Sequence, residues 1–255
     1  MEDARRLGKS ATLPAMAETR TERIAAHDGG SFDGYLWLPS EPNGAGIVLF
    51  QEIFGIAPYV RDVAERTASL GFAVLVPDLY WRIERGVALG GGEEHLASAM
   101  SYAGRFDWED GLKDCVAALE HLRALPEVTG PAGVLGFCLG GTLAYLLAAA
   151  STPDFAVAYY GSGVPDSLDR LDDITCPLLM HFGGSDQYIA RDKVAEVEKA
   201  VAGRRNIELH VHEEAGHAFD NHEAENFHNP QAAEDSWSNS TDFLLDQASR
   251  ATLKE

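Results

Sequence analysis

One cysteine in this sequence is well placed for covalent chemistry. It lies between two glycines in the stretch Gly136-Phe137-Cys138-Leu139-Gly140. Its Gly-x-Cys-x-Gly spacing matches the nucleophile elbow Gly-x-Ser-x-Gly, a sharp strand-to-helix turn that presents a nucleophile. In such a turn the N–H of Leu139 points into the site, and the positive end of the following helix favours a thiolate. The motif is short, and a glycine-rich turn around an inert, buried cysteine would give the same pattern.

A nucleophilic thiol needs a base, and the base needs an orienting group. Downstream of Cys138, Asp186 ends the apolar run "LLMHFGGSD", and His217 follows "ELHVHEEAG". The order nucleophile, acid, histidine, each at the end of a predicted strand, is the order of a Ser-Asp-His triad. We therefore predict Cys138 as nucleophile, His217 as base and Asp186 as acid. The alternative for Asp186 is a turn or a helix cap.

Other histidines make a metal site conceivable. His210 and His212 share one face of a predicted strand, and His222 and His228 follow in the sequence. No accompanying set of ligands has a recognisable spacing, however. We expect no metal and no cofactor.

Predicted strands and helices alternate along the chain. A hairpin over 23–39 precedes strands over 45–52, 73–78, 132–137, 155–160, 177–183 and 206–213. Helices are predicted over 59–72, 108–125, 141–150, 191–202 and 230–248, with a weak helix in a glycine-rich excursion over 82–106. Such alternation predicts an α/β fold with a mostly parallel central sheet and helices on both faces. The carboxyl ends of its strands would line the ligand site.

We expect a loose tail over residues 1–20 and a single domain over 21–250. Strand and helix signals occupy much of the interval between Cys138 and Asp186. That interval has no room for a large cap domain, so the 82–106 excursion is expected to shape the pocket.

Composition excludes several classes of partner. The chain has 255 residues, with 20 Lys+Arg against 40 Asp+Glu and a net charge of −20. Such a surface repels polyphosphate and anionic lipid, so we expect neither nucleic-acid nor membrane binding. The N-terminus lacks the apolar core of a secretory signal. Three cysteines without framework spacing are typical of a reducing cytoplasm, so a cytoplasmic monomer or small homo-oligomer is expected.

Taken together, the motifs resemble the dienelactone hydrolase family of α/β-hydrolases. The resemblance runs from the first hairpin to the last helix. It rests on "QEIFG" (51–55), "PDLYWR" (77–82), "GFCLGG" (136–141), "GGSD" (183–186) and "GHAF" (216–219), in family order. It implies an α/β-hydrolase fold, and a small ester or lactone hydrolysed without a cofactor, through a thioester on Cys138 with Asp186 and His217 completing the triad.

The resemblance also implies a role for Glu52, which pairs with the cysteine in the resting enzyme and helps to deprotonate it when substrate arrives. The N–H of Ile53 joins that of Leu139 as the oxyanion hole. A solvated carboxylate at a strand end is the alternative for Glu52. The apolar strand before it favours the functional role.

Substrate recognition is where the sequence departs from the family. Members that act on dienelactone bind its carboxylate with two arginines. One corresponds to Arg82, but the other position, four residues after His217, holds Asn221. Tyr80 and Phe219, from the motifs around these positions, are further candidates for substrate binding. Loss of one arginine weakens the selection of anions, and so leaves the natural substrate open.

Two alternatives to a dienelactone-type hydrolase stay open. The same triad could serve a promiscuous esterase, an acyltransferase or a phosphotriesterase. A protein of another class could use Cys138 for redox sensing or reversible ligand binding, which a resolving cysteine would favour. Cys115 falls on the apolar stripe of a predicted helix and Cys176 precedes a strand, and we expect both to be structural.

Overall fold

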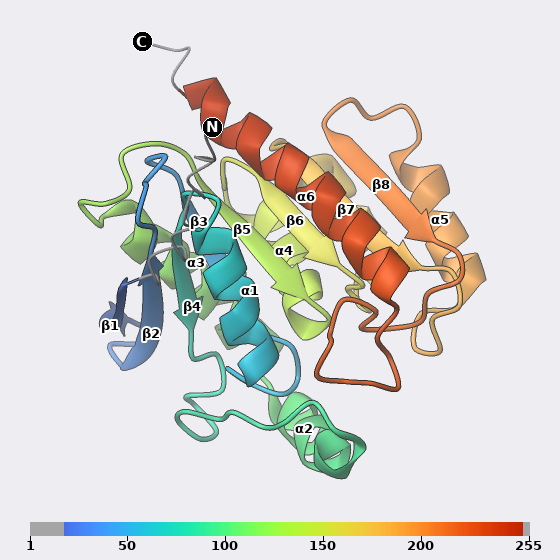
Figure 1. Ribbon diagram of the computed structural model, residues 1–255, viewed down its shortest axis with the longest axis horizontal. Helices are drawn as coiled ribbons and strands as arrows, with labels where there is room; N and C mark the ends of the chain where they lie inside the picture. The colour runs from blue at the N-terminus through green and yellow to red at the C-terminus, as the bar shows by residue number, and fades with distance from the viewer. Residues whose placement is uncertain (1–17, 252–255) are drawn as a thin grey trace, which may run out of the picture.

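A mostly parallel β-sheet forms the centre of the molecule (Figure 1). The computed structural model describes residues 18–251, and these residues form one eight-stranded sheet in the order β1-β2-β4-β3-β5-β6-β7-β8. The strands are β1 (Glu18–Ala25), β2 (Ser31–Leu38), β3 (Gly46–Phe50), β4 (Ala73–Pro77), β5 (Ala132–Phe137), β6 (Ala156–Tyr159), β7 (Leu178–Gly183) and β8 (Ile207–His212). The pairs β1–β2 and β2–β4 are antiparallel, and the others are parallel.

Helices cover both faces of this sheet, which confirms the predicted α/β architecture. They are α1 (Pro58–Ala68), α2 (Glu93–Arg105), α3 (Trp108–Arg123), α4 (Leu139–Ala150), α5 (Arg191–Val201) and α6 (Pro230–Ala251). In Figure 1, α1 and α6 lie in front of the sheet, and α3 and α4 lie behind it. The sequence did not predict the 3-10 helix η1 (Pro165–Asp173), whose short stretch "PDSLDRLDD" is mostly polar.

The central strands are buried along their whole length. Every residue of β3, β4, β5, β6 and β7 is buried, as expected for parallel strands covered on both faces. Their apolar side chains stabilise the fold, at about 1.5–3 kcal/mol for each large side chain that is fully buried. The carboxyl ends of these strands are therefore held rigidly.

Helix α2 lies apart from the sheet, below the carboxyl ends of the strands in Figure 1. Ala99 is its one fully buried residue, and it packs in a small apolar cluster with Phe54 and Ala57. This helix belongs to the predicted excursion over 82–106. We name Leu96, Met100 and Ala103 the α2 wall.

The first strand starts earlier than the predicted tail allows. Glu18, Thr19 and Arg20 belong to β1 and pair with β2, while residues 1–17 lie outside the described residues. Arg20 also forms ion pairs with Glu22 and Glu127. The prediction of a tail up to residue 20 is therefore wrong for its last three residues. The start of this edge strand is polar, so it carries no apolar signal.

None of the helices in the described part of the chain is long and apolar enough to cross a membrane.

Candidate active site

Cys138 occupies the turn between β5 and α4 with a left-handed backbone, at φ 55° and ψ −112°. A residue other than glycine rarely adopts a positive φ, so the surrounding structure must hold this turn in place. A Cβ on Gly136 would lie 2.0 Å from the carbonyl oxygen of Gly140, and one on Gly140 would lie 2.3 Å from that of Phe50. The two glycines therefore allow the start of α4 to sit against the ends of β5 and β3.

Cys138, His217 and Asp186 form one hydrogen-bonded line. His217 Nδ1 lies 2.7 Å from Asp186 Oδ2, and His217 Nε2 lies 3.1 Å from Cys138 Sγ. Asp186 follows the end of β7 and His217 lies in the loop after β8. The structure thus brings the predicted nucleophile, base and acid together, and their catalytic roles stay a prediction.

The contacts of Asp186 fit both interpretations of this residue. Its Oδ1 accepts hydrogen bonds from the N–H groups of Tyr188 and Ile189, at 2.7 and 3.0 Å, which is the turn-forming role. Its Oδ2 faces His217. The turn therefore fixes the carboxylate in the orientation that the imidazole requires.

The charge of His217 is set by its two neighbours. Burial favours the neutral imidazole, but the Cys138 sulfur and the hydrogen bond to Asp186 outweigh burial and raise the pKa of His217 to about 10. The imidazole is therefore protonated beside the sulfur at neutral pH. A cation in contact with the sulfur is typical of a reactive cysteine.

Glu52 lies just beyond the end of β3 with 2% of its surface exposed. Its Oε2 accepts a hydrogen bond from Asn221 Nδ2 at 2.7 Å, and its Oε1 accepts one from the Tyr160 hydroxyl at 3.3 Å. Burial raises the pKa of Glu52 to about 7, although both hydrogen bonds act in the opposite direction. The expected pairing of Glu52 with Cys138 does not occur in this structure, because neutral partners hold the carboxylate and His217 holds the sulfur.

A chain of buried hydrogen bonds continues behind Glu52. The Tyr160 hydroxyl lies 3.4 Å from that of Tyr59, which donates to Asp220 Oδ2 at 2.5 Å. Arg66 forms an ion pair with the same oxygen of Asp220. Sequence reasoning missed Tyr59, Tyr160 and Asp220, although Asp220 adjoins the candidate Asn221.

A cavity of about 190 Å³ opens in front of Cys138 and His217. Its wall includes Leu139 and Ile53, and neither of their N–H groups donates a hydrogen bond within the described residues. The remaining wall is mainly apolar. It consists of the α2 wall and of Glu52, Phe54, Trp108, Ser162, Tyr188, Ala218, Ala224 and Phe227.

The four residues predicted to bind substrate do not border this cavity. Arg82 makes a double hydrogen bond to Asp114, at 2.9 Å from each carboxylate oxygen. Tyr80 is buried, and its hydroxyl donates to the carbonyl of Ile53 at 3.0 Å. Phe219 is buried with its ring 5.2 Å from that of Tyr160, and the amide of Asn221 is directed at Glu52. These predicted substrate contacts are not supported, since each side chain is engaged inside the protein.

The predicted histidine pair does not form a metal site in the described residues. His210 contacts Glu208 at 2.6 Å, and His212 lies 3.3 Å from the buried His181.

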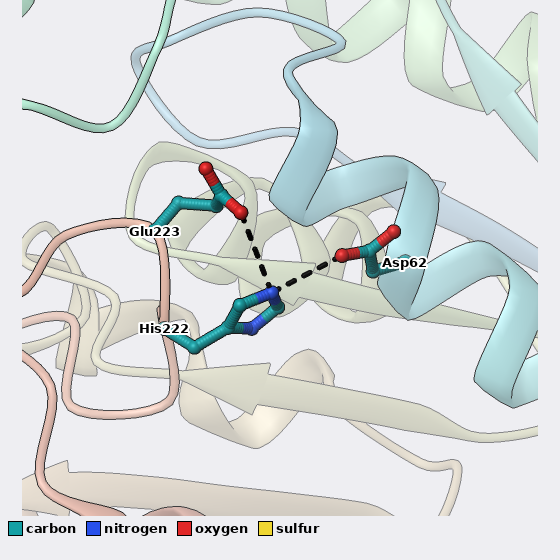
Figure 2. A group of neighbouring side chains, drawn as sticks. All are labelled: Asp62, His222 and Glu223. Atoms are coloured by element: carbon teal, nitrogen blue, oxygen red, sulfur yellow. Dashed lines mark hydrogen bonds and ion pairs between the residues drawn. The ribbon is translucent and has the colours of Figure 1, made fainter.

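Among residues 18–251, one group of three potential metal ligands lies close together: Asp62, His222 and Glu223, all exposed. Figure 2 shows His222 between the two carboxylates, at 3.1 Å from Asp62 and 3.7 Å from Glu223. One imidazole between exposed carboxylates is also an ordinary surface ion pair. The absence of a metal stays a prediction.

The sheet order, the strained turn after β5 and the helices on both faces define an α/β-hydrolase fold. A family model described as "Dienelactone hydrolase family" matches residues 32–248. The chain therefore belongs to the dienelactone hydrolase family, a family of enzymes, and the resemblance found in the sequence is confirmed.

Relatives and a solved structure agree with this assignment. The chain is 35% identical to "Carboxymethylenebutenolidase 1" of Cupriavidus pinatubonensis over 205 residues, which are 80% of this chain and 87% of that protein. It is 34% identical to "Carboxymethylenebutenolidase" of Pseudomonas putida over 197 residues, 77% of this chain and 84% of that protein. The crystal structure of a putative dienelactone hydrolase from Klebsiella pneumoniae has the same fold, with a TM-score of 0.75 and 24% identity over 89% of this chain and 97% of that one.

Proposed function

We propose that this enzyme hydrolyses small esters or lactones through a thioester on Cys138. The observation that carries the proposal is the hydrogen-bonded line from Asp186 through His217 to Cys138, which ends at the cavity. The names of its carboxymethylenebutenolidase relatives point to the same reaction class.

In the proposed acylation step, the Cys138 thiolate attacks the substrate carbonyl. The N–H groups of Leu139 and Ile53 border the cavity and have no acceptor in the described structure, so they are free to stabilise the oxyanion. When the tetrahedral intermediate collapses, the carbon–oxygen bond to the leaving group breaks, and protonated His217 gives its proton to the departing alkoxide. The products of this step are an alcohol, a thioester on Cys138 and a neutral His217.

In the proposed deacylation step, neutral His217 accepts a proton from water as the water oxygen adds to the thioester carbonyl. Collapse of the second intermediate breaks the carbon–sulfur bond and releases the carboxylic acid. The thiolate of Cys138 and the imidazolium of His217 are restored. Asp186 keeps the imidazole in one orientation throughout, through its contact with Nδ1.

We assign Glu52 an assisting role. Its carboxyl borders the cavity, and a pKa of about 7 places its ionisation near neutral pH. Glu52 helps to deprotonate Cys138 when substrate arrives, as the family resemblance implies. Asn221 and Tyr160 position the carboxyl for this role.

The mechanism is tested by trapping the intermediate. Purified protein mixed with p-nitrophenyl acetate should release p-nitrophenol and accumulate an adduct with the mass of one acetyl group, which peptide mapping places on Cys138. Cys176→Ser is the matched control and should keep both signals. Turnover by Cys138→Ala at the wild-type rate would overturn the proposed function.

A redox-sensing role for Cys138 has less support. It requires a second thiol that reaches the first one in a reactive form. Cys115 and Cys176 are free thiols, but both are buried. Burial raises the pKa of Cys176 to about 11 and that of Cys115 well above its ordinary value. A reducing compartment such as the cytoplasm suits an enzyme whose nucleophile is a thiol.

A further inference from the structure

Among the described residues, the cavity wall has an acidic side chain but no basic side chain that is free to pair with a substrate. His217, which is already paired with Cys138 and Asp186, is the one cation-forming side chain among the residues of 18–251 that border the cavity. Glu52 contributes a carboxyl group, and the hydroxyls of Ser162 and Tyr188 and the indole N–H of Trp108 are uncharged. A carboxylate on a substrate would lose its water here and find no free cation in return.

Arg82 is not available to supply that cation. Besides its double hydrogen bond to Asp114, its Nη1 forms an ion pair with Asp28 at 2.6 Å. The Asp114 side chain is 1% exposed. Turning Arg82 towards a substrate would leave a buried carboxylate without its cation, which is energetically unfavourable.

Asn221 is not available either. Its amide nitrogen donates to Glu52 at 2.7 Å, and its amide oxygen accepts from the N–H of Glu223 at 3.0 Å. Both ends of this side chain are therefore committed within the protein. The two positions to which the family resemblance assigns carboxylate binding thus make contacts within the protein in this chain.

The mouth of the cavity is apolar and exposed. Four large hydrophobic side chains among the described residues are exposed, and three of them border this cavity: Met100 at 52%, Trp108 at 43% and Tyr188 at 49%. Exposed apolar side chains gathered at a cavity mark a binding surface for an apolar group. Tyr188 also contacts His217, with the two rings 5.0 Å apart, so the apolar mouth adjoins the proposed reaction centre.

We propose that this site selects uncharged esters or lactones with apolar substituents, and that it discriminates against substrates carrying a carboxylate. The selection rests on the proposed thioester mechanism. An apolar substituent gains by leaving water at the α2 wall, Trp108 and Tyr188. A carboxylate instead meets Glu52 at close range and is slowed in its approach by the net charge of −20.

A matched pair of esters tests the selection. The two substrates are 4-carbamoylphenyl butyrate and 4-carboxyphenyl butyrate, which share the acyl group and differ in the charge on the leaving phenol. Each kcat/KM is divided by the rate at which hydroxide hydrolyses the same ester, because the two phenols differ in leaving ability. We expect the neutral amide to be preferred at least about tenfold at pH 8. A preference for the acid would overturn the inference.

A charge placed in the α2 wall should alter this preference. Met100→Arg introduces a guanidinium at the mouth, and Met100→Gln is a neutral control of similar length. We expect Met100→Arg to raise the acid-to-amide ratio about fivefold or more relative to Met100→Gln. Equal ratios in the two variants would show that charge at this mouth does not govern selection, and the inference would fall.

These outcomes are distinct from a failure of the mechanism. If Cys138→Ala hydrolyses the neutral ester as fast as the wild type, the proposed function is wrong. If Cys138→Ala is inactive while the wild type prefers the acid, the thioester mechanism stands and the inferred selectivity is wrong.

Discussion

The amide of Asn221 donates a hydrogen bond to Glu52 Oε2 at 2.7 Å, so a neutral side chain holds a buried carboxyl group at the edge of the cavity. An arginine at position 221 would favour the ionised form of such a carboxyl group. Because the Asn221 amide is neutral, burial is the dominant influence on the pKa of Glu52 and raises it to about 7. The stability of the protein therefore depends on pH through this residue.

We predict that Glu52→Gln stabilises the protein at pH 8. The pKa of Glu52 is about 7 in the folded protein and close to 4.5 when unfolded. The folded state therefore binds more protons between these values, and stability falls as pH rises from 4.5 to 7. Glutamine removes this penalty, on the order of 3 kcal/mol above pH 7. Thermal unfolding should show a gain at pH 8 that shrinks towards pH 4.5. The exposed Glu234→Gln should show no such gain, and an equal gain at both pH values would contradict the assignment.

Alkylation should distinguish the three cysteines. Cys138 borders the cavity and contacts protonated His217, whereas Cys115 and Cys176 are buried. We expect iodoacetamide to modify Cys138 first and to abolish ester hydrolysis in step with that modification. Peptide mapping over time gives the order. Full activity after complete alkylation of Cys138 would exclude it as the nucleophile.

Replacement of His217 should be nearly as damaging as replacement of the nucleophile, because members of a triad act as a unit. We expect His217→Ala to lower kcat by about a thousandfold or more. His210→Ala is the control, since His210 lies on β8 and contacts Glu208 rather than the cavity. Comparable losses in the two variants would mean that His217 is not the base.

The turn around Cys138 should tolerate no methyl group at Gly140. Alanine there would place its Cβ 2.3 Å from the carbonyl oxygen of Phe50. We expect Gly140→Ala to destabilise the fold by about 1–3 kcal/mol and to reduce turnover. Gly104 in α2 has nothing within 4 Å of an added Cβ, so Gly104→Ala should stabilise by about 0.5–1 kcal/mol. Chemical denaturation of both variants measures the contrast, and similar shifts would refute the steric argument.

Arg82 is expected to matter for folding rather than for substrate choice. Arg82→Ala leaves the buried Asp114 carboxylate without its cation, and should cost about 3 kcal/mol of stability. The acid-to-amide ratio of kcat/KM should stay at the wild-type value. A large change in that ratio with unchanged stability would restore Arg82 as a substrate ligand.

The sequence predicted the parts of the site that depend on local pattern. Apolar runs located the central strands, and the glycine spacing located the turn at Cys138. Asp186 and His217 followed from their places after strands, because the strand ends of a parallel sheet meet at one edge.

Contacts between distant segments were beyond such reasoning. The "PDLYWR" motif predicted that Arg82 binds substrate. Its actual partners, Asp28 and Asp114, lie 54 and 32 residues away in the sequence. Tyr59 reaches Asp220 across 161 residues. No one-dimensional pattern signals these pairs, since they arise only when distant segments of the chain pack together. Because such contacts decide which side chains remain free for substrate, the substrate residues were the least predictable part of the site.

The separate packing of α2 has a consequence for how new specificities arise. Its buried residue Ala99 lies in a small cluster with Phe54 and Ala57, whereas Cys138 follows the end of β5 and packs against the main core. Leu96, which packs against this small cluster, and the exposed Met100 can therefore be exchanged with little disturbance of the framework that holds Cys138, whereas Ala103 packs against the main core. Diversification at Leu96 and Met100 offers a short mutational route between substrates, along which the reacting residues stay the same and only the cavity wall changes.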